Sequence, residues 1–174
     1  MTGMLKEKTP NESLSITTKV VLPNDTNTLG KLFGGSLLAW IDEIGAVAAH
    51  RHSGRVSVTA SINNVSFTFP VDLGSIMTLE AKVSRAFNSS MEVIIDVYIE
   101  DSVTRDKTAS NQAILTFVAI DENGKSVEVP KLIPETEEEK ERYAAALRRR
   151  QLSLILAGRL KAEDAPELKA IFKL

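Results

Sequence analysis

The sequence predicts an α+β fold, in which an antiparallel sheet packs against one long apolar helix and a charged helical tail follows. Residues 36–50 repeat apolar side chains at helical spacing, whereas the later segments are rich in Val, Ile, Thr and Phe. A run of strands beside a single apolar helix is typical of α+β domains. With 174 residues, 43% of them hydrophobic, the chain is long enough for one domain and an additional element.

The expected elements begin with a strand over residues 14–22, where β-branched side chains roughly alternate with others. A polar, turn-rich loop follows, and Gly34 and Gly35 then introduce the apolar helix. This helix is expected to end at residues 50–54. Cationic side chains there would stabilise its carbonyl end, and Gly54 can adopt a left-handed cap.

Four further strands are expected from their content of β-branched and aromatic residues, over residues 56–69, 75–87, 91–100 and 108–120. Turn-forming residues separate each strand from the next. We therefore expect these strands to form an antiparallel meander.

The carboxyl-terminal part has a different composition. From residue 135 the sequence is rich in Glu, Arg and Ala, which is typical of an exposed helix. This helix is expected to run to about Ala157, with a weaker helical segment near residues 165–174. We expect a main domain over residues 13–130 and a C-terminal helical extension over residues 131–174.

Composition excludes several classes of protein. The chain has no cysteine, so a disulfide framework, a thiolate zinc site and a cysteine nucleophile are excluded. A formal net charge of -2 argues against a surface devoted to nucleic acid. The apolar runs are too short for a membrane span, and the first residues lack a signal-peptide pattern. We expect a cytoplasmic protein without stable membrane association.

Asp42 is the most unusual residue of the predicted helix, because its neighbours on the helix surface are apolar side chains or glycine. Burying an unpaired carboxylate there would cost several kcal/mol. Two interpretations stay open at this point. Asp42 and Glu43 form a solvated stripe, or Asp42 has a chemical function.

Other candidate motifs are weaker. Gly34 and Gly35 would let a ligand approach the first N–H groups of the helix, or they form only a sharp turn. His50 and His52 are the only histidines, and their spacing places them on different sides of a helix, so no metal site is expected. The segment after Gly34 lacks the final glycine of a nucleophile elbow, which disfavours a serine hydrolase.

Taken as one ordered pattern, residues 22–43 resemble the signature of hotdog-fold acyl-CoA thioesterases of the bacterial and brain acyl-CoA hydrolase type. The resemblance continues through residues 58–61, Phe67, residues 90–92 and residues 129–143. It covers most of the chain from residue 15 to residue 150.

The resemblance implies a curved antiparallel sheet wrapped around a long central helix, in subunits that assemble as dimers or as hexamers built from three dimers. It implies hydrolysis of fatty acyl-CoA to a fatty acid and CoA, at a site formed between two protomers and without a cofactor. Asp42 takes the position of the family's catalytic aspartate. Asn27 takes that of a loop asparagine from the opposite protomer, and Gly35 is expected to polarise the thioester carbonyl.

Contacts to substrate are expected from residues that the resemblance or their charge singles out: Gly34, Phe67, Arg85, Ser90, Met91, Arg142 and Arg148. The arginines, together with neighbouring Arg149 and Arg150, could bind the CoA phosphates or could form a solvated helix face. One position departs from the family pattern, because Asn63 stands where relatives often carry an aspartate.

Two other functions are considered. A non-catalytic acyl-CoA-binding or lipid-sensing protein would use the same groove without turnover, but it would not need Asp42 together with Asn27. A dehydratase of this fold would need a catalytic histidine near the helix, and His50 lies at the wrong end of it.

Overall fold

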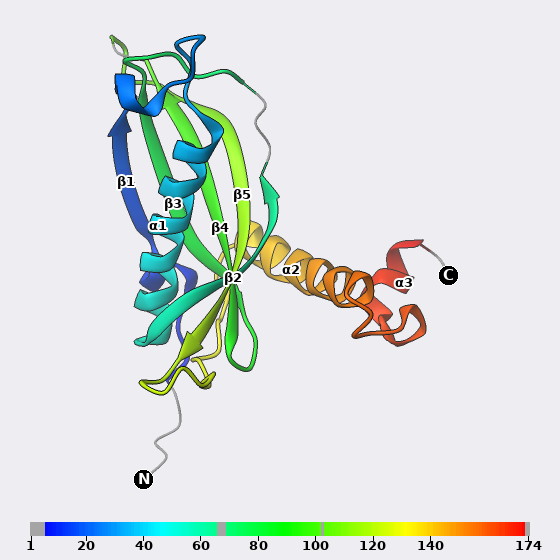
Figure 1. Cartoon of the computed structure of the whole chain (residues 1–174). Coiled ribbons are helices and arrows are strands. Elements are labelled where there is room, and N and C mark those ends of the chain that lie inside the picture. The colour runs from blue at the N-terminus through cyan, green and yellow to red at the C-terminus, as the bar shows by residue number, and fades with distance from the viewer. Residues whose placement is uncertain (1–5, 66–68, 102, 173–174) are drawn as a thin grey trace.

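The computed structural model describes residues 6–65, 69–101 and 103–172. Its centre is a five-stranded antiparallel sheet that curls around the long helix α1 (Figure 1). The strands are β1 (Ser15–Val20), β2 (Val56–Val65), β3 (Ile76–Ala86), β4 (Ser90–Glu100) and β5 (Lys107–Ile120). The helices are α1 (Gly34–Ser53), α2 (Glu137–Leu156) and α3 (Pro166–Phe172), with short 3-10 turns at Pro10–Ser13, Pro23–Asp25 and Ala162–Asp164. The predicted α+β architecture is confirmed.

Helix α1 lies against the concave face of the sheet because its apolar stripe matches the inward-facing strand residues. Ile41 and Ala48 on this stripe are completely buried. Gly45 allows a close approach to β5, since a Cβ there would lie 3.0 Å from the Phe117 ring. The helix ends as expected at Gly54, which has a φ of 65° and donates its N–H to the His50 carbonyl.

The expected meander is wrong for one strand. Strands β3, β4 and β5 pair in sequence order, but β2 pairs with β5 at the far edge, and β1 lies beside β3. The turn before β3 explains the difference, because it bonds to the loop before α1 instead of closing a hairpin. Leu32 N–H donates to the Val71 carbonyl at 2.8 Å, and Gly74 N–H donates to the Val21 carbonyl at 2.9 Å. The chain therefore crosses one end of the sheet between β2 and β3 (Figure 1).

Helix α2 begins against the convex face of the sheet, opposite α1, and its carboxyl-terminal end extends beyond the sheet (Figure 1). The exposed helix that the composition predicts is buried along one face, where Glu139, Ala146 and Gln151 are at most 9% exposed. Thr136 caps its first turn by accepting a hydrogen bond from the Glu139 N–H. None of the helices in the described residues is both long and apolar enough to cross a bilayer.

A buried ion pair fastens α2 to the sheet. Glu92 on β4 has a side chain only 3% exposed, and Arg149 of α2 binds both of its oxygens, at 2.6 and 2.9 Å. The hydroxyl of Ser84 donates a further hydrogen bond to Glu92 at 2.6 Å. The carboxylate is thus paired and hydrogen-bonded, as a buried charge requires.

Replacing one partner of this pair should destabilise the protein strongly. Arg149→Met is expected to lower the free energy of unfolding by about 3 to 5 kcal/mol, because Glu92 would remain buried without its counter-charge. The double variant Glu92→Gln Arg149→Met should recover most of the loss, and Lys140→Met, at an exposed ion pair, should cost at most about 1 kcal/mol. Urea unfolding of the four proteins measures this. Equal losses for Arg149→Met and Lys140→Met would contradict it.

Candidate active site

Asp42 lies half-buried near the middle of α1, on a side of the helix that meets the edge strand β2. Its Oδ1 accepts a hydrogen bond from the hydroxyl of Thr59 on β2. Among the described residues Asp42 has no ion-pair partner, whereas the exposed Glu43 beside it pairs with Lys19 at 3.8 Å. The two acids therefore do not form one solvated stripe. Thr59 orients one oxygen of Asp42, and no described residue binds the other.

Thr59 is the site residue that the sequence analysis did not single out. It belongs to the segment of residues 58–61, which carries part of the family resemblance. A threonine in a strand is ordinary, however, and its role depends on β2 lying at the sheet edge beside the middle of α1. The strand register fixes the position of Thr59 along the sheet, because Thr59 pairs with Phe117 on β5.

The amino end of α1 presents backbone N–H groups. Phe33 is the N-cap, and its carbonyl accepts hydrogen bonds from Ser36 and Leu37. The N–H groups of Gly34 and Gly35 donate to no carbonyl in the described part of the chain. Since these groups lie at the positive end of the helix dipole, they can bind a carbonyl oxygen that gains negative charge.

Asn27 lies in the exposed loop before α1. Its Oδ1 accepts hydrogen bonds from the N–H groups of Leu29 at 2.9 Å and Lys31 at 3.2 Å, which hold the loop in shape. Its amide nitrogen has no partner among the described residues. Asn27 can therefore offer an N–H donor to a ligand without losing the bonds that order the loop.

Asn27 and Gly34 border a groove of about 390 Å³ at the amino end of α1. Its wall is mostly apolar and includes Leu29, Leu32, Leu37, Phe69, Pro70 and Val71. A groove of this size, with a few polar groups at its border, is typical of small-molecule sites. Asp42 does not line it.

Within one protomer the predicted catalytic residues fall into two groups. Asn27 and the first N–H groups of α1 lie together, whereas Asp42 lies two helical turns further along, an axial distance of about 10 Å. No hydrogen bond among the described residues joins Asn27 to Asp42. One reacting carbonyl cannot contact Gly35 and Asp42 of the same helix.

The edge beside Asp42 is open. Strand β2 pairs on one side only, with β5. Three apolar side chains of β2 are at least 44% exposed, namely Val56, Val58 and Ile62. Val47, in the second half of α1, is 43% exposed. An unpaired apolar edge is a surface on which another strand can pair.

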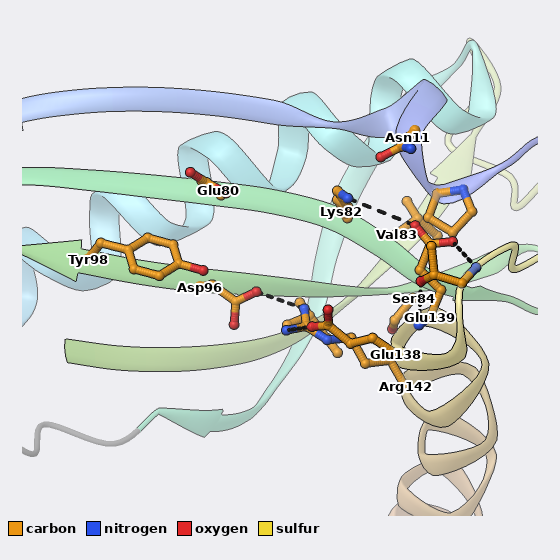
Figure 2. A pocket seen from close by; sticks show the side chains of 13 residues that line it. Asn11, Glu80, Lys82, Val83, Ser84, Asp96, Tyr98, Glu138, Glu139 and Arg142 are labelled. Atoms are coloured by element: carbon orange, nitrogen blue, oxygen red, sulfur yellow. Dashed lines mark hydrogen bonds and ion pairs between the residues drawn. The ribbon is translucent and has the colours of Figure 1, made fainter. Parts of the chain in front are cut away.

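Two of the arginines predicted to bind substrate are held inside the protomer. Arg142 pairs with Asp96 and Glu138, each at 2.7 Å, in a groove of about 260 Å³ on the convex face (Figure 2). Burial opposes its charge, but the hydrogen bond and charge of Asp96 raise the pKa of Arg142. Arg85 donates to the Tyr143 carbonyl at 2.9 Å and stacks on the Tyr143 ring. Both arginines fasten α2 to the sheet.

The charged side chains in the groove of Figure 2 have partners, and Asp42 is not among the residues that line it; Glu80 pairs with Lys107 outside the groove at 3.2 Å. Besides the pairs of Arg142, Lys82 lies 3.9 Å from Glu139. This groove therefore does not provide the reactive group.

The other predicted contacts have different surroundings. Met91 is completely buried in the core, where the protomer alone gives a ligand no access. Ser90 is 7% exposed and accepts a hydrogen bond from Arg150 at 3.0 Å. Arg148 has no hydrogen bond or ion pair with a described residue and borders a groove beside Gln112. Phe67 lies outside the described residues.

The two histidines stabilise the end of α1. His52 is completely buried and donates its Nε2–H to the Pro130 carbonyl at 2.8 Å, and burial lowers its pKa. His50 Nδ1 bonds to the Arg55 carbonyl at 2.9 Å. Among the described residues no group of three His, Cys, Asp or Glu side chains could hold a metal ion.

Comparison with known proteins identifies the family. The family model described as the thioesterase superfamily matches residues 29–105, which include Asp42 and Thr59. The uncharacterized acyl-CoA thioester hydrolase YkhA of Bacillus subtilis is 44% identical over 128 residues, which cover 74% of this chain and 74% of that protein.

Solved structures agree with this match. An apo-hexameric acyl-CoA thioesterase is 40% identical, with a TM-score of 0.84 over 88% of this chain and 98% of its own. The acyl-CoA hydrolase of Staphylococcus aureus, solved with butyryl-CoA, CoA and CoA disulfide, is 38% identical, with a TM-score of 0.81 over 94% of this chain and 99% of its own.

The Staphylococcus aureus enzyme has also been solved with an asparagine, an aspartate or a threonine replaced by alanine. Along that chain the three residues have the same order and the same separations as Asn27, Asp42 and Thr59 have here. By sequence identity, coverage and fold, this chain belongs to the acyl-CoA thioester hydrolases of the thioesterase superfamily.

Proposed function

We propose that the protein hydrolyses the thioester of fatty acyl-CoA to a free fatty acid and CoA. The observation that carries the proposal is Asp42, a half-buried carboxylate oriented by Thr59 and free of a counter-charge among the described residues. The family supports it, since its members named above are acyl-CoA thioester hydrolases and one was solved with butyryl-CoA. Asp42 distinguishes this activity from acyl-CoA binding without turnover.

The active site is composite, with each half supplied by a different protomer. One protomer provides the N–H groups of Gly34 and Gly35 and the Asn27 amide, and the other provides Asp42 and Thr59. The separation of about 10 Å between the two groups in a single chain supports this arrangement. So does the open β2 edge, which would pair with its copy about a twofold axis. The hexameric relative supports a further assembly of such dimers.

The chemistry follows from the charges that develop during hydrolysis. Attack on the thioester carbonyl turns its oxygen into an oxyanion, which the N–H groups at the amino end of α1 stabilise. The Asn27 amide adds an N–H donor beside them. The apolar groove next to Gly34 takes the start of the acyl chain and keeps water away from that side.

Asp42 supplies the electron pair for this attack. Its free oxygen either removes a proton from water, which then attacks the carbonyl, or attacks the carbonyl itself to form an anhydride that water opens. In both routes CoA leaves as a thiolate, and the net reaction consumes one water. A single turnover in ¹⁸O-water separates the two routes. In the anhydride route, water that attacks the aspartyl carbon of the anhydride leaves ¹⁸O in the Asp42 carboxylate. The general-base route leaves no label in Asp42.

The activity itself is tested by thiol release. The purified wild-type protein, incubated with acyl-CoAs of graded chain length, should release CoA with saturation kinetics at rates in the ordinary enzyme range of about 1 to 1,000 per second. A thiol-reactive dye measures the release, and the matched control is the Asp42→Asn protein from the same preparation. Tight acyl-CoA binding without release at any chain length would favour the non-catalytic alternative.

Two properties stay predictions from the sequence. We propose that hydrolysis needs no cofactor, because Asp42, water and backbone N–H groups supply every group that the reaction uses. We also propose a cytoplasmic location. Activity that survives dialysis against a chelator, and cell fractionation of the native protein, test them separately.

A further inference from the structure

Asn63 departs from the family pattern, and the proposed mechanism gives it no role. It lies on β2, four residues after Thr59. Its side chain joins two hydroxyl groups. Ser61 donates to the Asn63 Oδ1 at 2.9 Å, and the Asn63 Nδ2 donates to the hydroxyl of Thr116 on β5 at 3.1 Å. These three side chains form a bridge between the edge strand and its neighbour.

Strand β2 pairs irregularly on both sides of this bridge. Thr59 and Ser61 pair with adjacent residues of β5, so Ala60 between them is an extra residue without a partner there. A second shift in the register leaves Asn63 unpaired in the same way. Such bulges bend a strand and disrupt its ladder of backbone hydrogen bonds. Side-chain bonds therefore matter more for the shape of residues 59–64 than they would in a regular strand.

The bridge lies on the face of the sheet opposite Asp42. Thr116 lies between two completely buried core residues of β5, so its side chain points to the other, convex face. Thr59 points toward α1, where its hydroxyl bonds to Asp42. In a regular strand Ser61, two residues further on, would share the face of Thr59. The extra residue Ala60 lets the chain change face, and the bridge holds it in that arrangement.

We propose that Asn63 is a positioning residue for hydrolysis and acts through Thr59. This inference rests on the proposed function and extends it. The bridge fixes the bulge at Ala60 and so keeps the Thr59 hydroxyl directed at Asp42. Without the bridge the edge strand can shift, and a small displacement of an orienting group slows a reaction strongly. An aspartate, which relatives often carry at this position, would keep the bridge, because both hydroxyls can donate to its carboxylate.

The first test measures thiol release from acyl-CoA. Asn63→Ala should lower kcat about fivefold, the scale for losing one neutral hydrogen bond, and leave KM within about twofold. Asn63→Asp should keep kcat within about twofold of the wild type. Thr116→Val, which removes the other end of the bridge, should match Asn63→Ala. Gln112→Ala is the matched control, since it removes a different side-chain bond of β5, to Asp96 at 2.7 Å, and should leave kcat unchanged.

A double-variant cycle tests whether Asn63 acts through Thr59. Once Thr59→Val has removed the hydroxyl, adding Asn63→Ala should lower kcat by less than about twofold. Equal losses in the two backgrounds would overturn the inference. So would an unchanged kcat in Asn63→Ala, or an Asn63→Asp protein as slow as Asn63→Ala. Circular dichroism melting verifies that each variant keeps its fold.

Failure of the proposed function is a separate outcome. If the wild-type protein releases no thiol from any acyl-CoA, that function fails. Crystal structures of the wild type and Asn63→Ala then decide the inference. Loss of the hydrogen bond between Thr59 and Asp42 in the variant supports it, and a bond that stays in place in both proteins overturns it.

Discussion

Asp42→Asn should lower kcat for acyl-CoA hydrolysis by at least about a hundredfold, while KM and the fold stay close to those of the wild type. The amide has nearly the same shape as the carboxylate, and its oxygen can still accept the hydrogen bond from Thr59. It cannot take a proton from water, and it is a poor nucleophile. The loss therefore falls on the chemical step.

Two further variants make this result specific. Glu43→Gln removes the neighbouring acid, which is exposed and paired with Lys19, and should change kcat by less than about twofold. Thr59→Val keeps the Asp42 charge but removes its orienting hydrogen bond, so its kcat should lie between those of the wild type and Asp42→Asn. Initial rates of thiol release at saturating substrate measure all three. An Asp42→Asn protein as active as the wild type would show that another group performs the reaction.

Local sequence patterns were sufficient to predict most of the helices and strands. The apolar spacing of residues 36–50 predicted α1, and Gly54 has the left-handed conformation expected of its cap. The β-branched segments predicted all five strands with small differences at their ends. These features depend on residues close together in the chain, so their physical causes are visible in the sequence.

Pairings between distant segments were not predictable in the same way. The position of β2 at the sheet edge depends on how the turn near Val71 bonds to the loop before α1, and no residue near β2 signals it. Thr59 gained its role only from that position. The partners of Arg85, Arg142 and Arg149 depend on how α2 packs against the sheet, which the local sequence does not specify.

The second large effect comes from combining two inactive proteins. In a composite site Asn27 and Asp42 act on one substrate from different protomers. Asn27→Asp keeps the oxygen that orders the loop but removes the free N–H donor and adds a negative charge. Asp42→Ala removes the catalytic carboxylate. Each homo-oligomer lacks one required group at every site and should be nearly inactive.

A mixed dimer restores one site. It has one site that has lost both groups and one that has both intact, because a twofold dimer draws each site from both chains. After random exchange of equal amounts, about half of the dimers are mixed, and each has one working site of two. Exchange should therefore return about a quarter of wild-type activity.

The measurement that tests the composite site most directly is the rate of thiol release after Asn27→Asp and Asp42→Ala are unfolded together, refolded and shown by mass spectrometry to be mixed oligomers. The account predicts about a quarter of the wild-type rate. It also predicts no recovery when the two folded proteins are combined under conditions that prevent subunit exchange. Mixed oligomers that stay as inactive as their parents would show that Asn27 and Asp42 do not act together across the interface.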